Sequence, residues 1–240
     1  MRKKRAAAVI MALGATVAAC APGQFEQVAR ELGAPFGRPA LTEEQVAAGL
    51  KEALQVGTEN AVASAARPNG YFANPKIKIP MPPRLQRLAD TLRAMGLTRQ
   101  VEEFVLSMNL AAEQAAPQAT AIFLDAITAM TFEDARLILQ GQDDEATQYF
   151  KAKTSTRLYG LFRPIVQGSM ERIGVTRLYQ DLTARYMALP LVSRPDLDLN
   201  HYVTMKSLDG LFFMVGEEER RIRTDPAARV TAILREVFSR

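Results

Sequence analysis

The sequence predicts an all-α protein: a single multi-helix bundle with one extended Pro-rich loop or short strand pair near residues 67–83. Apolar residues recur every three or four positions along most of the chain after residue 40, which is the spacing of a buried helix face. Helix start signals precede several of these stripes, among them Thr42 with Gln45 three residues later, the spacing of a capping box. Because 48% of the chain is hydrophobic, we expect residues 41–240 to form one helical domain with a sizeable core.

Residues 1–19 have the pattern of a bacterial lipoprotein signal peptide. Four basic residues at positions 2–5 precede an uncharged run from Ala6 to Ala19, and Cys20 follows directly. The run is shorter than the roughly 20 residues that a membrane-spanning helix needs. We therefore expect cleavage before Cys20 and lipidation of this residue, with a diacylglycerol and then an acyl group such as palmitate. The alternatives are a plain secretory signal with a coincidental cysteine and an uncleaved anchor.

A lipid on Cys20 would hold the protein at the membrane of a bacterial cell envelope. Each buried methylene contributes about 0.8 kcal/mol, so one acyl chain binds weakly while two or three bind essentially permanently. By the enteric sorting rule, Ala21 in place of an aspartate after the cysteine favours the outer membrane, facing the periplasm. The sequence leaves the choice between the inner and outer membrane open.

Residues 20–40 are predicted to be a flexible tether behind the lipidated cysteine. Six glycine and proline residues interrupt this stretch: Pro22, Gly23, Gly33, Pro35, Gly37 and Pro39. A chain of this length reaches at most about 70 Å when extended, enough to hold a domain clear of lipid headgroups.

Helices are expected in sequence from residue 41 to the end of the chain. The predicted helical segments are Thr42–Val62, Val101–Ala112, Ala119–Met130, a short helix between Thr131 and Gly141, a long one capped by Asp143 or Asp144 and kinked at Pro164, Leu178–Leu189, and Tyr202–Val215. A last helix is expected after Asp225-Pro226, an N-cap followed by proline at the first helical position. Its apolar stripe consists of Val230, Ile233, Leu234, Val237 and Phe238.

Residues 67–83 interrupt the helical pattern. Asn69-Gly70 marks a turn, Lys76 to Ile79 alternates between charged and apolar side chains, and the prolines at 80, 82 and 83 exclude a helix. Two interpretations are open. Ile77 and Ile79 could plug the helical core from a surface-crossing loop, or the segment could form an exposed edge that a partner strand extends.

Several separated motifs resemble a known bacterial family. They are Leu41–Gln45 with Gly49–Leu54, Asn74-Pro75 with Ile77–Pro80, Met130–Arg136, Ala146-Thr147 with Tyr149-Phe150, Phe162–Val166, and Thr224–Arg229. In this order they resemble the domain-of-unknown-function family numbered 4197, over roughly residues 41–238. The resemblance implies a helical domain on exported, often lipid-anchored proteins, and it assigns no activity or catalytic residues.

The charge balance gives no sign of nucleic-acid binding. The full chain has 30 basic and 26 acidic residues, but residues 1–19 hold four of the basic and none of the acidic ones. The mature chain is therefore formally neutral, whereas a phosphate-binding surface needs a local basic excess. With Cys20 lipidated, no thiol remains for a disulfide, a metal site or a nucleophile.

The sequence contains no recognisable catalytic, cofactor-binding or metal-binding motif. His201 is the only histidine, and Asp198, three residues before it, is more simply the N-cap of its helix than a catalytic or metal partner. Residues 143–145 are acidic and are interpreted as a helix cap, and residues 217–219 with the arginines at 220, 221 and 223 as a solvated helix face. The remaining candidates are carboxylates that could meet inside the bundle: Glu102, Glu113, Glu133 and Asp134.

These observations leave three hypotheses for function. The first is a lipid-anchored lipoprotein of the periplasm with a helical domain that binds or scaffolds another envelope protein, without catalysis. The second is a carrier of a lipid or another apolar ligand, because eight of the 10 methionines follow the signal peptide and flexible side chains can line adaptable pockets as well as fill a core. The third is an enzyme that uses carboxylates alone.

Overall fold

The computed structural model describes residues 42–190 and 197–225, and these contain helices and turns but no β-strand. The helices are α2 (Glu43–Ala66), α3 (Gln86–Ala94), α4 (Thr98–Ala115), α5 (Ala119–Ala129), α6 (Phe132–Gln140), α7 (Glu145–Ile173), α8 (Val175–Met187) and α9 (Leu199–Thr224), with 3-10 turns at Pro83–Leu85 and Ala116–Gln118. The all-α prediction is confirmed. The predicted signal peptide, Cys20, the tether and the last predicted helix lie outside the described residues.

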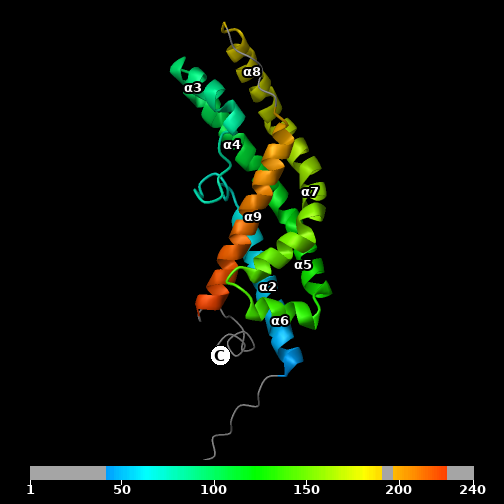
Figure 1. Ribbon diagram of the computed structural model, residues 1–240. Helices are drawn as coiled ribbons and strands as arrows, with labels where there is room; N and C mark the ends of the chain where they lie inside the picture. Colours follow the sequence, from blue (N-terminus) through cyan, green and yellow to red (C-terminus); the bar gives the residue numbers. More distant parts are fainter. Residues whose placement is uncertain (1–41, 191–196, 226–240) are drawn as a thin grey trace, which may run out of the picture. The chain divides into compact units, whose positions relative to one another are not determined.

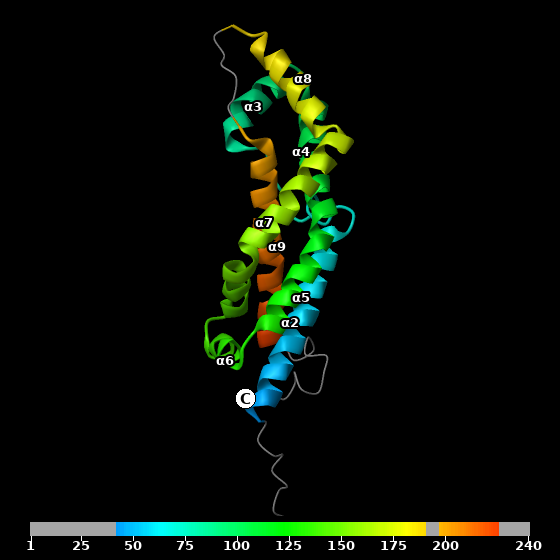
Figure 2. The ribbon, with the colours of Figure 1, turned by 90° about the vertical axis from the view of Figure 1, so that its right-hand side faces the viewer.

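The four longest helices pack together, and α9 contacts α2, α4 and α7. The short helices lie at opposite ends of this arrangement: α3 and α8 pack on each other and on α4, while α6 packs on α2 and α7 (Figures 1 and 2). The helix α5 lies between α2 and α7. Three of the largest buried side chains meet in the interior, because Phe123 of α5 makes edge contacts with Phe150 of α7 and Phe212 of α9.

Local sequence signals set most of the helix ends. Thr42 and Gln45 form the predicted capping box at the start of α2, and Thr131 forms a second one with Asp134 at the start of α6. Hydrogen bonds from the backbone and side chain of Thr131 lower the pKa of Asp134, which keeps this cap charged. Gly174 ends α7 with a φ of +88°, a left-handed conformation that suits glycine. The helix α7 continues through Pro164.

The segment between α2 and α3 consists of turns rather than strands. Ile77 and Ile79 are 4% and 1% exposed, so the interpretation of these residues as a core plug is confirmed. The backbone N–H and C=O of Ile79 both bond to the side-chain amide of Asn109 on α4, at 2.8 and 2.9 Å. These groups are therefore already paired, and this part of the segment offers no free edge to a partner strand.

We did not predict α3, although its sequence carries a helical signal. Leu85, Leu88, Ala89 and Leu92 follow the prolines at the spacing of one helix face, and all four are buried. The prolines at 80, 82 and 83 indicated a loop and not a helix. A proline at the first position of a 3-10 or α-helical turn, such as Pro83, is nevertheless compatible with a helix start.

Gly210 on α9 allows the segment after α2 to approach closely. A Cβ atom at this position would lie 2.7 Å from Cε1 of Tyr71 and 3.1 Å from Cβ of Ile77. We expect Gly210→Ala to lower the free energy of unfolding by about 1–3 kcal/mol, because a methyl group would overpack this contact. Chemical denaturation followed by circular dichroism measures the change.

Gly216, six residues further along the same helix, is the matched control. A Cβ atom added at Gly216 would lie 3.5 Å from its nearest neighbour, Oγ1 of Thr147, which is an ordinary contact distance. Gly216→Ala should therefore raise stability by about 0.5–1 kcal/mol, through the better helix propensity of alanine. Equal effects of the two substitutions would contradict the close approach at Gly210.

Candidate functional site

The N-terminus of α7 receives its cap from another helix. Asp144 stands at the N-cap position but makes no capping hydrogen bond with its side chain. Instead, Glu219 of α9 accepts hydrogen bonds from the backbone N–H groups of Ala146 and Thr147, both at 2.9 Å, and from the Thr147 hydroxyl at 2.7 Å. A carboxylate at a helix N-terminus also interacts favourably with the helix dipole.

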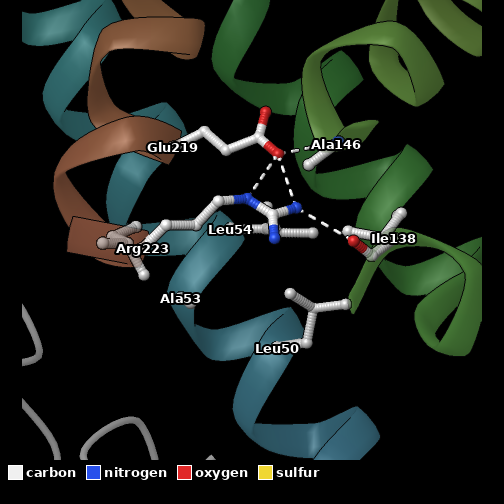
Figure 3. Close-up of a pocket in the computed structure, with 8 residues that line it drawn as sticks. Leu50, Ala53, Leu54, Ile138, Ala146, Glu219 and Arg223 are labelled. Atoms are coloured by element: carbon white, nitrogen blue, oxygen red, sulfur yellow. Dashed lines mark hydrogen bonds and ion pairs between the residues drawn. The ribbon is translucent and has the colours of Figure 1, made fainter. Parts of the chain in front are cut away.

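Arg223 completes this junction. Its guanidinium lies 2.9 Å from Oε1 of Glu219 and donates a second hydrogen bond of 2.9 Å to the carbonyl of Ile138, near the end of α6 (Figure 3). The pair therefore joins α9 to the end of one helix and the start of the next. The predicted pair of Glu219 and Arg223 is present. The prediction that this part of the helix forms a solvated face is wrong for Glu218 and Glu219, because these residues are only 8% and 5% exposed. The apolar surface of α2 covers both glutamates. The spacing of charges along one helix does not reveal that a second helix packs on them.

The space beside this pair is too small to be a ligand site. It lies between α2, α6 and α9 and is lined by Leu50, Leu54, Ile138 and Ile222 as well as the two charged residues (Figure 3). Its volume is about 10 Å³. This is at the lower limit for one water molecule, so the charged pair is a structural junction.

Glu113 of α4 is a second buried carboxylate that binds backbone amides. It accepts hydrogen bonds from the N–H groups of Asn69 and Tyr71, both at 3.1 Å, and of Phe72 at 3.3 Å. The Tyr71 hydroxyl, in turn, donates to the carbonyl of Ser207 on α9 at 2.7 Å. Burial, and secondarily the charge of Glu113, raises the pKa of Tyr71 far above its usual value, so this hydroxyl stays a donor.

The carboxylates considered for a catalytic pair do not meet. Glu113 holds the loop, Glu102 pairs with Arg93, and Asp134 caps α6. Glu133 pairs with Arg136 on the surface. Within residues 42–190 and 197–225, no three acidic, histidine or cysteine side chains lie close enough together to hold a metal ion.

His201 lies on the surface, next to a tyrosine. The carboxylate of Asp198 accepts the backbone N–H of His201 at 2.8 Å, so the predicted N-cap is confirmed. The other oxygen of Asp198 pairs with Arg163 at 3.0 Å. The imidazole Nδ1 is 2.8 Å from the Tyr159 hydroxyl, and Asp198 therefore does not orient the ring as it would in a catalytic triad.

A groove of about 450 Å³ lies between α7 and α9. Buried Leu208 and Phe212 contribute to its wall, and Met205 is 40% exposed beside them. Its polar lining residues are Lys151, Ser155, Thr156, Tyr159 and Asp209. The hydrogen bond between Tyr159 and His201 connects this lining to the only histidine of the chain. Sequence periodicity did not reveal the groove, because it depends on which two helices are neighbours.

A second groove of about 210 Å³ lies between the start of α2 and α6. Its apolar lining comes from Val46, Ala47, Phe132, Ala135 and Leu139, and Phe132 is 40% exposed. The charged residues at its rim are Glu43 and Arg136.

These features define an all-helical protein, whose described residues form surface grooves and contain buried carboxylates that bind backbone amides. A family model described as "Protein of unknown function (DUF4197)" matches residues 40–239, and the chain belongs to this family. No curated protein and no solved structure matches the chain. Of the helices in the described part of the chain, none combines the length and the apolar character needed to cross a bilayer.

Replacing Glu219 should destabilise the domain strongly. In Glu219→Gln, Arg223 loses its charge partner in a buried position, and the α7 terminus keeps one acceptor oxygen instead of two. We expect the free energy of unfolding to fall by about 3 kcal/mol, the usual cost of breaking a buried pair. Glu217→Gln is the matched control: its partners Lys76 and Arg220 are more than half exposed, so the change should stay below about 1 kcal/mol. A difference of less than about 1 kcal/mol between the variants would contradict the junction.

Proposed function

We propose that this chain is a lipid-anchored lipoprotein of the bacterial envelope whose helical domain binds another envelope protein. The groove between α7 and α9 is the observation that carries the binding role. Its volume of about 450 Å³ falls in the range of recognition pockets, and its lining combines buried apolar side chains with a polar rim. The helical domain thereby acts as a binding module held at a membrane.

The anchor is inferred from the first twenty residues and from the position of the family region. Cys20 follows a short apolar run, and the match to the family begins at residue 40. About twenty residues therefore separate the attachment point from the region that matches the family, and a tether of this length lets the domain reach a partner near the bilayer. The outer membrane is the proposed location, on the basis of Ala21.

The groove between α7 and α9 suits an amphipathic segment of a partner protein. Its two walls are antiparallel helices, since Thr147 bonds to Glu219 and Arg163 to Asp198. An incoming helix can lay an apolar face on Leu208, Phe212 and the exposed part of Met205. Methionine adapts its shape to an incoming side chain at little cost, which suits a protein-binding surface.

Charge at the rim indicates an acidic residue on the partner. Asp209 already pairs with Lys206 at 2.9 Å, and no ion pair joins Lys151 to a carboxylate within the described parts of the chain. The Lys151 ammonium lies 6.0 Å from the Phe212 ring centroid. A partner carboxylate placed here would gain an ion pair next to a surface that excludes water.

The same geometry favours a protein partner over the two other hypotheses. Four of the methionines considered for a ligand pocket, at 81, 108, 130 and 170, are buried in the core between other side chains. The carboxylates considered for catalysis are occupied by backbone amides or by surface arginines. Organic extraction of purified protein followed by mass spectrometry tests the carrier hypothesis directly.

Metabolic labelling tests the anchor. Cells that express the protein and receive an alkyne fatty acid should transfer the label to the wild-type chain, and Cys20→Ser should remove the label, because no other thiol is present. Ala21→Ser, one position further, should keep it. Label that persists on Cys20→Ser would contradict the proposed anchor.

Site-specific photocrosslinking tests the groove. We expect a benzoylphenylalanine at position 205 to form one heterologous crosslink in intact cells, because this side chain faces the partner. The same probe at position 187 is the control, since Met187 is equally exposed, at 42% against 40%, but belongs to α8. Lys151→Glu should reduce the crosslink at 205 about tenfold, as expected for the reversal of one charge pair that contributes 1.4 kcal/mol or more.

Two results would contradict the proposed groove. One is an equal crosslink at positions 187 and 205, and the other is a crosslink at 205 that Lys151→Glu leaves unchanged.

A further inference from the structure

The groove between α7 and α9 ends at a polar pair formed by Tyr159 and His201. Tyr159 lines the groove, and its hydroxyl is 2.8 Å from Nδ1 of His201. The two rings also make an edge contact, with their centroids 5.7 Å apart. His201 precedes Met205 by four positions and Leu208 by seven, so it continues the stripe of α9 that lines the groove. The imidazole therefore lies at the end of the groove, where it is held by a side chain of α7.

No ion pair joins this imidazole to a carboxylate within residues 42–190 and 197–225. One oxygen of Asp198 accepts the backbone N–H of His201, and the other pairs with Arg163 at 3.0 Å. In the same part of the chain, Nδ1 is paired with the Tyr159 hydroxyl, whereas Nε2 makes no hydrogen bond. The titratable or charged groups around the ring are therefore Tyr159 and Arg163 on α7 and Asp198 at the start of α9. Since His201 is exposed, a group of another molecule can reach the ring.

We infer that His201 is a second cationic anchor of this groove and binds an acidic side chain of the partner protein. The inference rests on the proposed function, which places an acidic residue of the partner beside Lys151. Lys151 and Tyr159 are eight positions apart on α7, about 12 Å along the helix axis. A partner helix in the groove meets both ends with two acidic residues that lie about two turns apart on one face. The apolar wall of α9 lies between these two contacts.

The chemistry of imidazole makes this contact depend on pH. Histidine gains a positive charge as the pH falls from about 8 to about 5, and both nitrogens of the charged ring are donors. Nδ1–H of His201 then bonds to the oxygen of Tyr159, which has lone pairs to accept it, and Nε2–H is left for the partner. Because a carboxylate binds the charged ring more strongly than the neutral one, the contact is strongest at acidic pH and weakens as the proton leaves.

Charge substitutions at position 201 test this anchor in the full chain that carries benzoylphenylalanine at position 205. His201→Glu should reduce the heterologous crosslink about tenfold, because two carboxylates then face each other. His201→Lys should keep the crosslink at the wild-type level or above it, because lysine supplies a positive charge that does not depend on the imidazole. Asn200→Glu is the matched control. It introduces the same charge one position earlier, about 100° around the helix from the groove stripe, and should leave the crosslink unchanged.

The pH dependence provides a second readout. In extracts of the same cells, the wild-type crosslink at 205 should be about threefold stronger at about pH 5.5 than at about pH 7.5, and His201→Lys should remove this difference. Equal crosslinks in His201→Glu and His201→Lys, or a pH dependence that persists in His201→Lys, overturn the anchor at His201 and leave the proposed groove in place. A wild-type chain that gives no crosslink at 205 overturns the proposed groove itself, and the anchor with it.

Discussion

The fold depends on two buried carboxylates that accept hydrogen bonds from backbone N–H groups. Turns and helix ends leave such groups without partners, and an unpaired amide in a low-dielectric interior costs several kilocalories. Glu113 binds three of them in the segment after α2, and Glu219 binds two at the start of α7. Both glutamates lie on long helices, α4 and α9, so each fixes a distant piece of chain to a rigid element.

This use of carboxylates gives Glu113 and Glu219 a structural role. A carboxylate that accepts several amide hydrogen bonds is fixed in position, which is a property of a structural anchor. The described residues also form surface grooves, and α9 contributes one wall of the groove that it shares with α7.

Sequence reasoning predicted the features that depend on neighbouring residues. The capping box at Thr42, the helix start at Thr131 and the N-cap at Asp198 all follow from short-range hydrogen bonding. The buried role of Glu219 was not predictable, because an i,i+4 pair with an arginine looks the same on a solvated face. Glu113 gave no signal either, since its partners are more than 40 positions away. The grooves depend on which helices become neighbours, and no local pattern encodes that.

The contacts of Tyr71 set an order of events during synthesis. Its hydroxyl bonds to a carbonyl 136 positions later, and Lys76 pairs with a glutamate 141 positions later. A chain that leaves the ribosome N-terminus first has finished this early segment long before α9 exists, and the loop closes only when that helix arrives. Until then the Tyr71 hydroxyl and the Lys76 ammonium lack these partners, so the early segment gains its final contacts only after α9 has been made.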